Sequence, residues 1–142
     1  MNLNTKAQRI MLGYLGMTSL LIGAWAQFAP RSFYDKFPGL GRVWVAIDGP
    51  YNEHLIRDVG GLNLALCAVL VFALVTMGRT MIQAAAIGSL LYGVPHVVYH
   101  IANHSGLDTG DAVASIGGLA VFAVLPLLLL LSARQETGTA AP

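Results

Sequence analysis

Residues 112–131 read AVASIGGLAVFAVLPLLLLL, a stretch of 20 residues without a charged side chain. A helix needs about 20 mainly apolar residues to cross the roughly 30 Å hydrocarbon core of a bilayer. Three further segments, at 10–28, 55–76 and 81–101, approach this length and composition. Only 11% of the residues are charged, against about a quarter in a soluble domain. The sequence therefore predicts an all-α integral membrane protein, an up-down bundle of four transmembrane helices.

The connections between these segments predict a single domain over residues 1–134 and a polar tail at 135–142. The connections at 77–80 and 102–111 are short, so each is expected to join antiparallel neighbours. The first segment also resembles a secretory signal, because Lys6 and Arg9 precede an apolar run that ends near Ala24 and Ala26. We expect this segment to be retained as a helix.

Positive charges bear on the orientation of the bundle. A plain count of Lys and Arg is tied, with four on each side. One side carries Lys6, Arg9, Arg79 and Arg134, and the other carries Arg31, Lys36, Arg42 and Arg57. The second group is concentrated around one long loop, where Asp35 and Asp48 offset it. We therefore predict a multi-pass plasma-membrane protein with both termini in the cytoplasm.

The long first connection, residues 29–52, combines prolines and glycines with aromatic side chains. The aromatic residues are Phe33, Tyr34, Phe37, Trp44 and Tyr51. Aromatic rings settle at the depth of the lipid headgroups. We predict that this loop lies on the membrane surface and caps the bundle.

Three of the four histidines lie at a spacing of four residues near the end of the third segment: His96, His100 and His104. Each residue of an α-helix turns by about 100°, so a step of four moves the helix face by only about 40° and rises by roughly 6 Å. The three imidazoles are therefore expected to form one stripe. Polar residues flank it at Tyr92, Tyr99 and Asn103.

A second polar group lies at the start of the second predicted helix. The spacing of four residues pairs His54 with Asp58 and Glu53 with Arg57. A carboxylate beside a histidine fixes its tautomer and strengthens it as a base or metal ligand. Asn63 continues this polarity toward the middle of the membrane.

These two polar groups are expected to meet, because the second helix begins on the side of the bilayer where the third ends. Asp58 then lies at the depth of His100, and Asn63 at that of His96. Ionisable groups within a bilayer are costly and mark functional candidates. We therefore predict a pocket near the non-cytoplasmic face. Its candidate metal-binding or ligand-binding residues are His54, Asp58, His96, His100 and His104, with Glu53, Arg57, Asn63, Tyr92, Tyr99 and Asn103 around them.

Three functions are compatible with this pocket. A metal or redox-cofactor site leads, with a transition metal ion or haem as the cofactor, because imidazole ligates zinc, copper and iron. Three histidines spanning about 12 Å cannot all bind one ion from a straight helix. The first alternative is an accessory subunit of a larger membrane complex. The second is a one-sided pocket for protons or for a small ligand, such as a polar headgroup or a quinone-like molecule.

Other classes of function receive no support. A net charge of +1 without a basic run excludes a nucleic-acid footprint. Cys67 is the single cysteine, which excludes an internal disulfide and a Cys-x-x-Cys pair. The sequence contains no Gly-x-Ser-x-Gly, no His-Glu-x-x-His and no phosphate-binding glycine loop. An enzyme that acts on a lipid stays open, with His54 and Asp58 as an acid-base pair, but no second reactive group can be assigned to it. Whether the protein is an enzyme is therefore left open, and no catalytic residue is assigned.

The run LIRDVGGLNLA at 55–65 carries a family resemblance, together with the basic N-terminus, the glycine-containing first helix and the proline-marked loop. In these features the chain resembles, over residues 10–131, the DoxX-like four-helix membrane proteins and neighbouring families of unknown function. The resemblance implies a four-helix fold and, for some members, association with redox enzymes. It supplies no catalytic residues and does not extend to the histidine stripe.

Overall fold

The computed structural model describes residues 3–135, so the predicted polar tail lies outside the described residues apart from Gln135. Within the described residues the fold is all-α, as predicted, with one small hairpin. The elements are α1 (Thr5–Phe28), α2 (Pro30–Lys36), β1 (Pro38–Gly39), β2 (Arg42–Val43), α3 (Glu53–Thr76), α4 (Arg79–Ala102) and α5 (Thr109–Gln135). Strands β1 and β2 pair antiparallel.

The four predicted apolar segments lie in α1, α3, α4 and α5, and each of these helices is long and apolar enough to cross a membrane. The helices begin between two and five residues before the predicted segments. The first turn of a helix has unpaired backbone N–H groups and therefore favours polar caps, which an apolar window misses. The side chain of Asn4 accepts a hydrogen bond from the N–H of Ala7 at 2.8 Å, and Asn52 accepts one from Leu55 at 3.1 Å.

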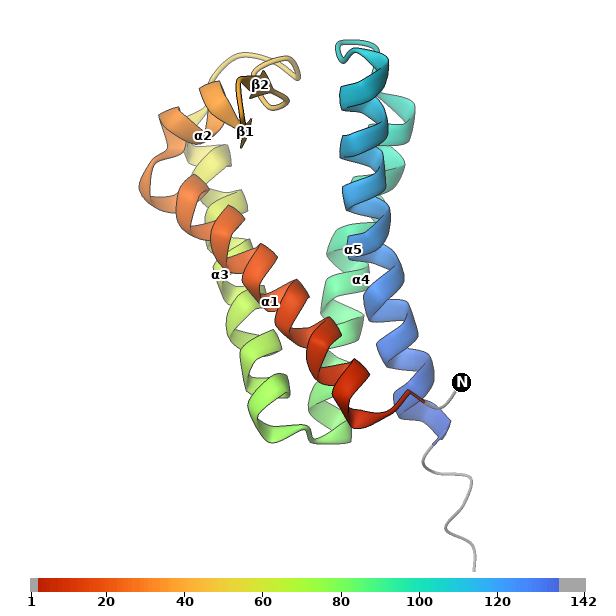
Figure 1. Cartoon of the computed structure of the whole chain (residues 1–142). Coiled ribbons are helices and arrows are strands. Elements are labelled where there is room, and N and C mark those ends of the chain that lie inside the picture. Colours follow the sequence, from red (N-terminus) through yellow and green to blue (C-terminus); the bar gives the residue numbers. More distant parts are fainter. Residues whose placement is uncertain (1–2, 136–142) are drawn as a thin grey trace, which may run out of the picture.

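The long helices form two pairs, with α1 packed along α3 and α4 packed along α5 (Figure 1). The pairs converge where the short turn after α3 leads into α4, and they diverge toward the other end. We call these the convergent end and the open end. The buried core at the convergent end includes Leu12, Leu15, Leu70, Ala85 and Leu129.

A buried hydrogen bond also joins the two pairs near the chain termini. Gln8 Nε2 in α1 donates to Ser132 Oγ in α5 at 3.3 Å, and both side chains are buried. Ser132 Oγ in turn donates to the carbonyl oxygen of Leu129 at 2.9 Å. In an apolar interior a satisfied polar contact of this kind favours one specific arrangement of helices.

Glycines allow α1 and α3 to approach closely. A Cβ atom at Gly60 would lie 2.5 Å from the backbone nitrogen of Gln27, and one at Gly23 would lie 2.9 Å from that of Leu64. The neighbouring Gly61 is different, since its nearest contact is Gln27 Oε1 at 3.8 Å. Close backbone approach at small residues is a main source of helix association in lipid.

Residues 30–52, which we call the cap, cover the end of the α1–α3 pair. The prediction of a long loop was incomplete here, because the segment forms α2 and the hairpin. Aromatic side chains hold it together. The Phe33 and Phe37 rings are 4.8 Å apart, Phe37 and Trp44 are 6.0 Å apart, and Trp25 of α1 packs on Phe33 at 5.8 Å.

The glycine contact generates a stability prediction. We expect Gly60→Ala to destabilise the protein by about 1–3 kcal/mol, because the new methyl group overlaps the backbone of Gln27. Gly61→Ala, one residue away in the same helix, is expected to be neutral or slightly stabilising. Thermal unfolding of both variants in detergent micelles measures the difference. Equal melting temperatures for the two variants would contradict the close packing of α1 on α3.

Candidate ligand cavity

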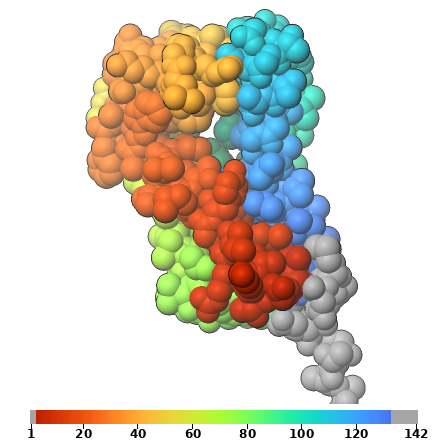
Figure 2. Space-filling model, in the orientation of Figure 1, coloured from red at the N-terminus to blue at the C-terminus, as the bar shows by residue number. Residues whose placement is uncertain are grey.

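A cavity of about 600 Å³ lies between the two helix pairs at the open end, beneath the cap. It exists because the pairs diverge while the cap extends from one pair toward the other. In the space-filling view an opening lies between α1 and α5 below the cap (Figure 2). Most of the lining is apolar or aromatic, including Ile22, Phe37, Val59, Leu119 and Phe122. Ligand cavities in proteins are typically of this size and composition.

The polar wall of the cavity belongs mainly to α4. The rings of Tyr92, His96, His100 and Tyr99 all line the cavity and touch one another in that order. Ring centroids are 5.4 Å apart for Tyr92 and His96, 5.0 Å for His96 and His100, and 5.6 Å for His100 and Tyr99. The helical spacing of four residues aligns the two imidazoles on one face. We call these four residues the ring ladder.

Asn63 of α3 meets this wall from the other helix pair. Its side chain is only 1% exposed and lines the cavity. The amide Nδ2 donates to the carbonyl oxygen of Val59 at 2.9 Å and to the hydroxyl of Tyr92 at 3.2 Å. The two bonds orient the amide and connect α3 to α4, so five of the predicted residues lie together at one cavity.

His54 and Asp58 lie elsewhere, which corrects the expectation that they face His100. Their side chains are 88% and 62% exposed, they pair with each other at 3.3 Å, and neither lines the cavity. Helix phase explains the difference. Ile56, Val59 and Asn63 face the cavity, and at about 100° per residue His54 and Asp58 point to the opposite side of α3. Position along the helix sets the depth of these residues, whereas the direction in which they point also depends on how α3 is rotated against its neighbours.

The remaining predicted residues also lie outside the cavity lining. Glu53 pairs with Arg57 at 2.8 Å, and Arg57 also donates to the backbone carbonyl of Gln27, which ties α3 to the end of α1. Asn103 Nδ2 donates to the carbonyl oxygen of Tyr99 at 2.9 Å. His104 Nδ1 lies 2.8 Å from the carbonyl oxygen of Ile101. Asn103 and His104 thus satisfy backbone groups at the end of α4.

The predicted set of metal donors is not assembled. Within residues 3–135 no group of three or more His, Cys, Asp or Glu side chains is placed to hold a metal ion. His96 and His100 are adjacent, but the carboxylate expected beside them points away on α3. Cys67 is buried. Of the predicted donors, only His96 and His100 therefore lie together at the cavity.

Several residues that line the cavity were not predicted from the sequence. Trp44 and Asp48 of the cap line the cavity, as do Ser115, Leu119 and Phe122 of α5. The aromatic composition of the loop was the available signal for the cap. No comparable signal existed in α5, because its membrane-length segment is mainly apolar on every side and periodicity does not select a face.

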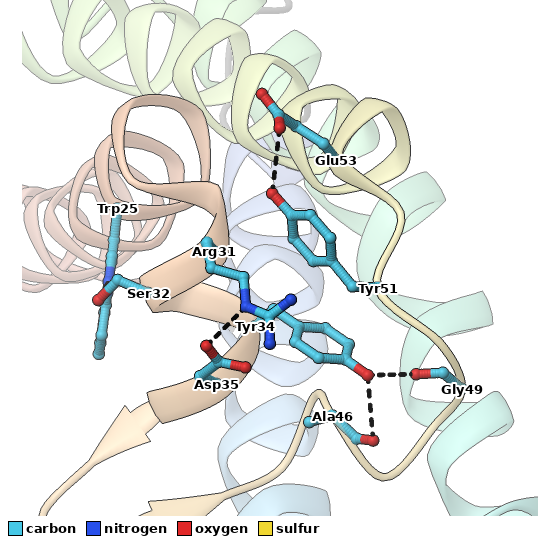
Figure 3. A network of polar contacts seen from close by, with 9 residues as sticks. All are labelled: Trp25, Arg31, Ser32, Tyr34, Asp35, Ala46, Gly49, Tyr51 and Glu53. Atoms are coloured by element: carbon cyan, nitrogen blue, oxygen red, sulfur yellow. Dashed lines mark hydrogen bonds and ion pairs between the residues drawn. The ribbon is translucent and has the colours of Figure 1, made fainter.

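A polar network braces the outer side of the cap (Figure 3). Arg31 pairs with Asp35 at 2.8 Å and lies over the rings of Tyr34 and Tyr51 at 5.7 and 4.9 Å. The hydrogen bond to Asp35 and its charge raise the pKa of Arg31. Loss of solvation, followed by the nearby Glu53 carboxylate, raises the pKa of Tyr51. Both side chains therefore keep their ordinary charge at neutral pH.

The cap is anchored on both of its sides. On its own pair, Trp25 Nε1 of α1 donates to Ser32 Oγ of α2 at 3.2 Å. Toward the other pair, Arg42 of β2 forms an ion pair with Asp111 in the first turn of α5. Ile47 also lies against Gly106, in the connection before α5. These contacts close the cavity above while the side between α1 and α5 stays open.

Comparison with protein-family models, with curated proteins and with solved structures found no match for this chain. The resemblance to DoxX-like proteins therefore stays a prediction from the sequence.

The ion pair across the cavity generates a second prediction. We expect Arg42→Glu and Asp111→Arg each to lower stability, and the double charge swap to recover part of the loss. Because the Arg42 side chain is 50% exposed, the coupling is expected to be about 0.2–1 kcal/mol at low salt. Thermal unfolding of the four proteins at two salt concentrations measures it. If the double variant instead loses as much stability as the two single variants together, the pair does not connect the cap to α5.

Proposed function

We propose that this chain is a multi-pass integral membrane protein that binds a small, mainly apolar molecule in the cavity between its helix pairs. The observation that carries the proposal is the cavity itself. It combines about 600 Å³ of largely apolar space with one polar wall and an opening between two membrane-length helices. Proteins that take up apolar ligands bury most of the ligand surface and orient it with a few polar groups.

The surroundings of the cavity support entry from the bilayer. The outward faces of the long helices carry exposed apolar residues such as Leu62, Phe72 and Val75. A soluble protein rarely exposes so many large apolar side chains together. In an up-down bundle within the membrane, the opening between α1 and α5 faces lipid, and a dissolved apolar molecule reaches the cavity without crossing water.

The orientation proposed from the charges places the cap outside the cytoplasm. Both termini then lie in the cytoplasm of a plasma-membrane protein, and the convergent end is cytoplasmic. The cavity belongs to the non-cytoplasmic half of the bilayer, where the aromatic cap matches the preference of Trp and Tyr for the headgroup region.

A photoreactive probe tests the proposed function. We expect a diazirine-bearing fatty alcohol, added to the protein in lipid nanodiscs, to label Leu119 and Phe122 saturably. Val59→Trp fills the cavity and is expected to abolish this labelling. The matched control is Val75→Trp, on the same helix at a side chain that is 72% exposed. Mass spectrometry of the labelled peptides measures the outcome.

Two results of that experiment would overturn the proposal. One is labelling of Leu119 and Phe122 that rises linearly with probe concentration, as simple partition into lipid would give. The other is saturable labelling that Val59→Trp leaves unchanged while the variant keeps the stability of the parent protein.

Metal or haem binding is the alternative that the adjacent imidazoles of His96 and His100 favour. Two donors leave most of a metal's coordination sphere to other molecules, since structural sites hold four protein ligands and catalytic sites three. We therefore expect protein purified without chelator to contain no stoichiometric transition metal ion. Haem needs only one or two axial protein ligands, so the absorption spectrum of the same protein tests for it separately. Stoichiometric metal that His100→Ala removes and His54→Ala keeps would establish the metal site instead.

A role as accessory subunit is the other alternative. The observation that favours it is the exposed pair of His54 and Asp58, beside the half-exposed pair of Glu53 and Arg57 on α3. Polar groups near a membrane surface can pair with a neighbouring protein. Such a partner would contact the outer side of α3, opposite the cavity, and both functions can then occur in one protein.

A further inference from the structure

The residues that line the cavity indicate which charge its ligand can have. None of its described lining residues is Lys or Arg, and the carboxyl side chain among them is that of Asp48. A fatty-acid carboxylate or a lipid phosphate entering this space would lose water without meeting a Lys or Arg side chain, and an imidazole would first have to take up a proton to pair with it. The lining therefore favours an uncharged molecule.

Two helix N-termini at the open end are also unsuited to an anion. Helix N-termini commonly bind anions through their free N–H groups and dipole. At α3 the Asn52 side chain already accepts from Leu55, and Glu53 occupies the first turn. At α5 the Asp108 carboxylate accepts from the N–H of Asp111 at 2.9 Å, and Asp111 itself is acidic. Both ends are occupied by the chain's own oxygen atoms or carboxylates.

The polar wall offers hydrogen-bond donors. The Tyr92 hydroxyl accepts from Asn63, so its own hydrogen is available for another acceptor. Among the described residues, no acceptor for it is observed. A neutral imidazole carries one N–H and one acceptor nitrogen, and His96 and His100 lie next along the wall. An oxygen that accepts from these groups satisfies several donors at once.

Shape favours a flat ring for the part of the ligand that meets this wall. The ring ladder presents aromatic faces and edges along α4, and Phe37 and Trp44 approach from the cap. Aromatic groups gain specific stacking and edge contacts with another ring beyond the burial of area. Ile22, Val59 and Leu119 provide apolar contact for a tail.

We infer that the ligand is an uncharged ring ketone with an apolar tail, the chemical class to which membrane quinones belong. Its carbonyl oxygen accepts from Tyr92 and from an imidazole of the ring ladder, and its tail extends through the opening between α1 and α5. This inference rests on the proposed function and narrows it to one class of ligand.

Decylubiquinone is the probe for this inference. We expect it to quench tryptophan fluorescence saturably in nanodiscs of neutral lipid, since Trp44 lines the cavity. Tyr92→Phe is expected to weaken binding about fivefold to tenfold, as loss of one hydrogen bond to a buried acceptor predicts. Tyr51→Phe, a tyrosine outside the lining, is expected to bind as the parent does. Decanoic acid at pH 8 is expected not to compete.

Two outcomes would overturn the inference. Decanoate that displaces decylubiquinone at similar concentrations would show that the cavity does not select against charge. Unchanged binding by both Tyr92→Phe and a His96→Ala, His100→Ala double variant would show that the wall does not hold the carbonyl. Saturable labelling by the fatty alcohol without decylubiquinone binding overturns the ring ketone alone, whereas absence of both overturns the proposed function as well.

Discussion

The packing of two helix pairs at one end is the constraint on which the rest of the structure depends. At the convergent end, leucines from three helices and the buried bond from Gln8 to Ser132 hold the pairs together. Along α1 and α3, glycines bring the backbones so close that even a methyl group at Gly60 or Gly23 would overlap the neighbouring helix. In the proposed membrane setting, where helices gain little from apolar burial, these contacts decide which helices stay together.

The cavity follows from the same packing. Helices that converge at one end and separate at the other leave a wedge, and the cap closes the wide end through its aromatic core and through Arg42. The ring ladder and Asn63 then form the polar part of an otherwise apolar space. The place of the cavity, the lack of Lys and Arg in its described lining and its hydrogen-bond donors support the proposed uncharged ligand more strongly than they support a metal ion.

The candidate site was predictable where one helix determined it. A spacing of four residues is enough to place His96 and His100 on one face, and the cavity lies on that face. The residues on the other side of the cavity were harder to predict, because they depend on how two helices are rotated relative to each other. Asn63 faces the cavity, whereas His54 and Asp58, in the same helix, point away and pair with each other.

Composition and length by themselves determined the all-α class and the four membrane-length helices, because the bilayer thickness sets how many apolar residues a span needs. The spacing of residues within α4 determined that its rings share a face. Only the tertiary structure decided which helices pair, where the wedge opens and which side chains enter it. The physical reason is that these features depend on close contacts between segments far apart in the chain, such as Gly60 with Gln27, and no local pattern encodes such contacts.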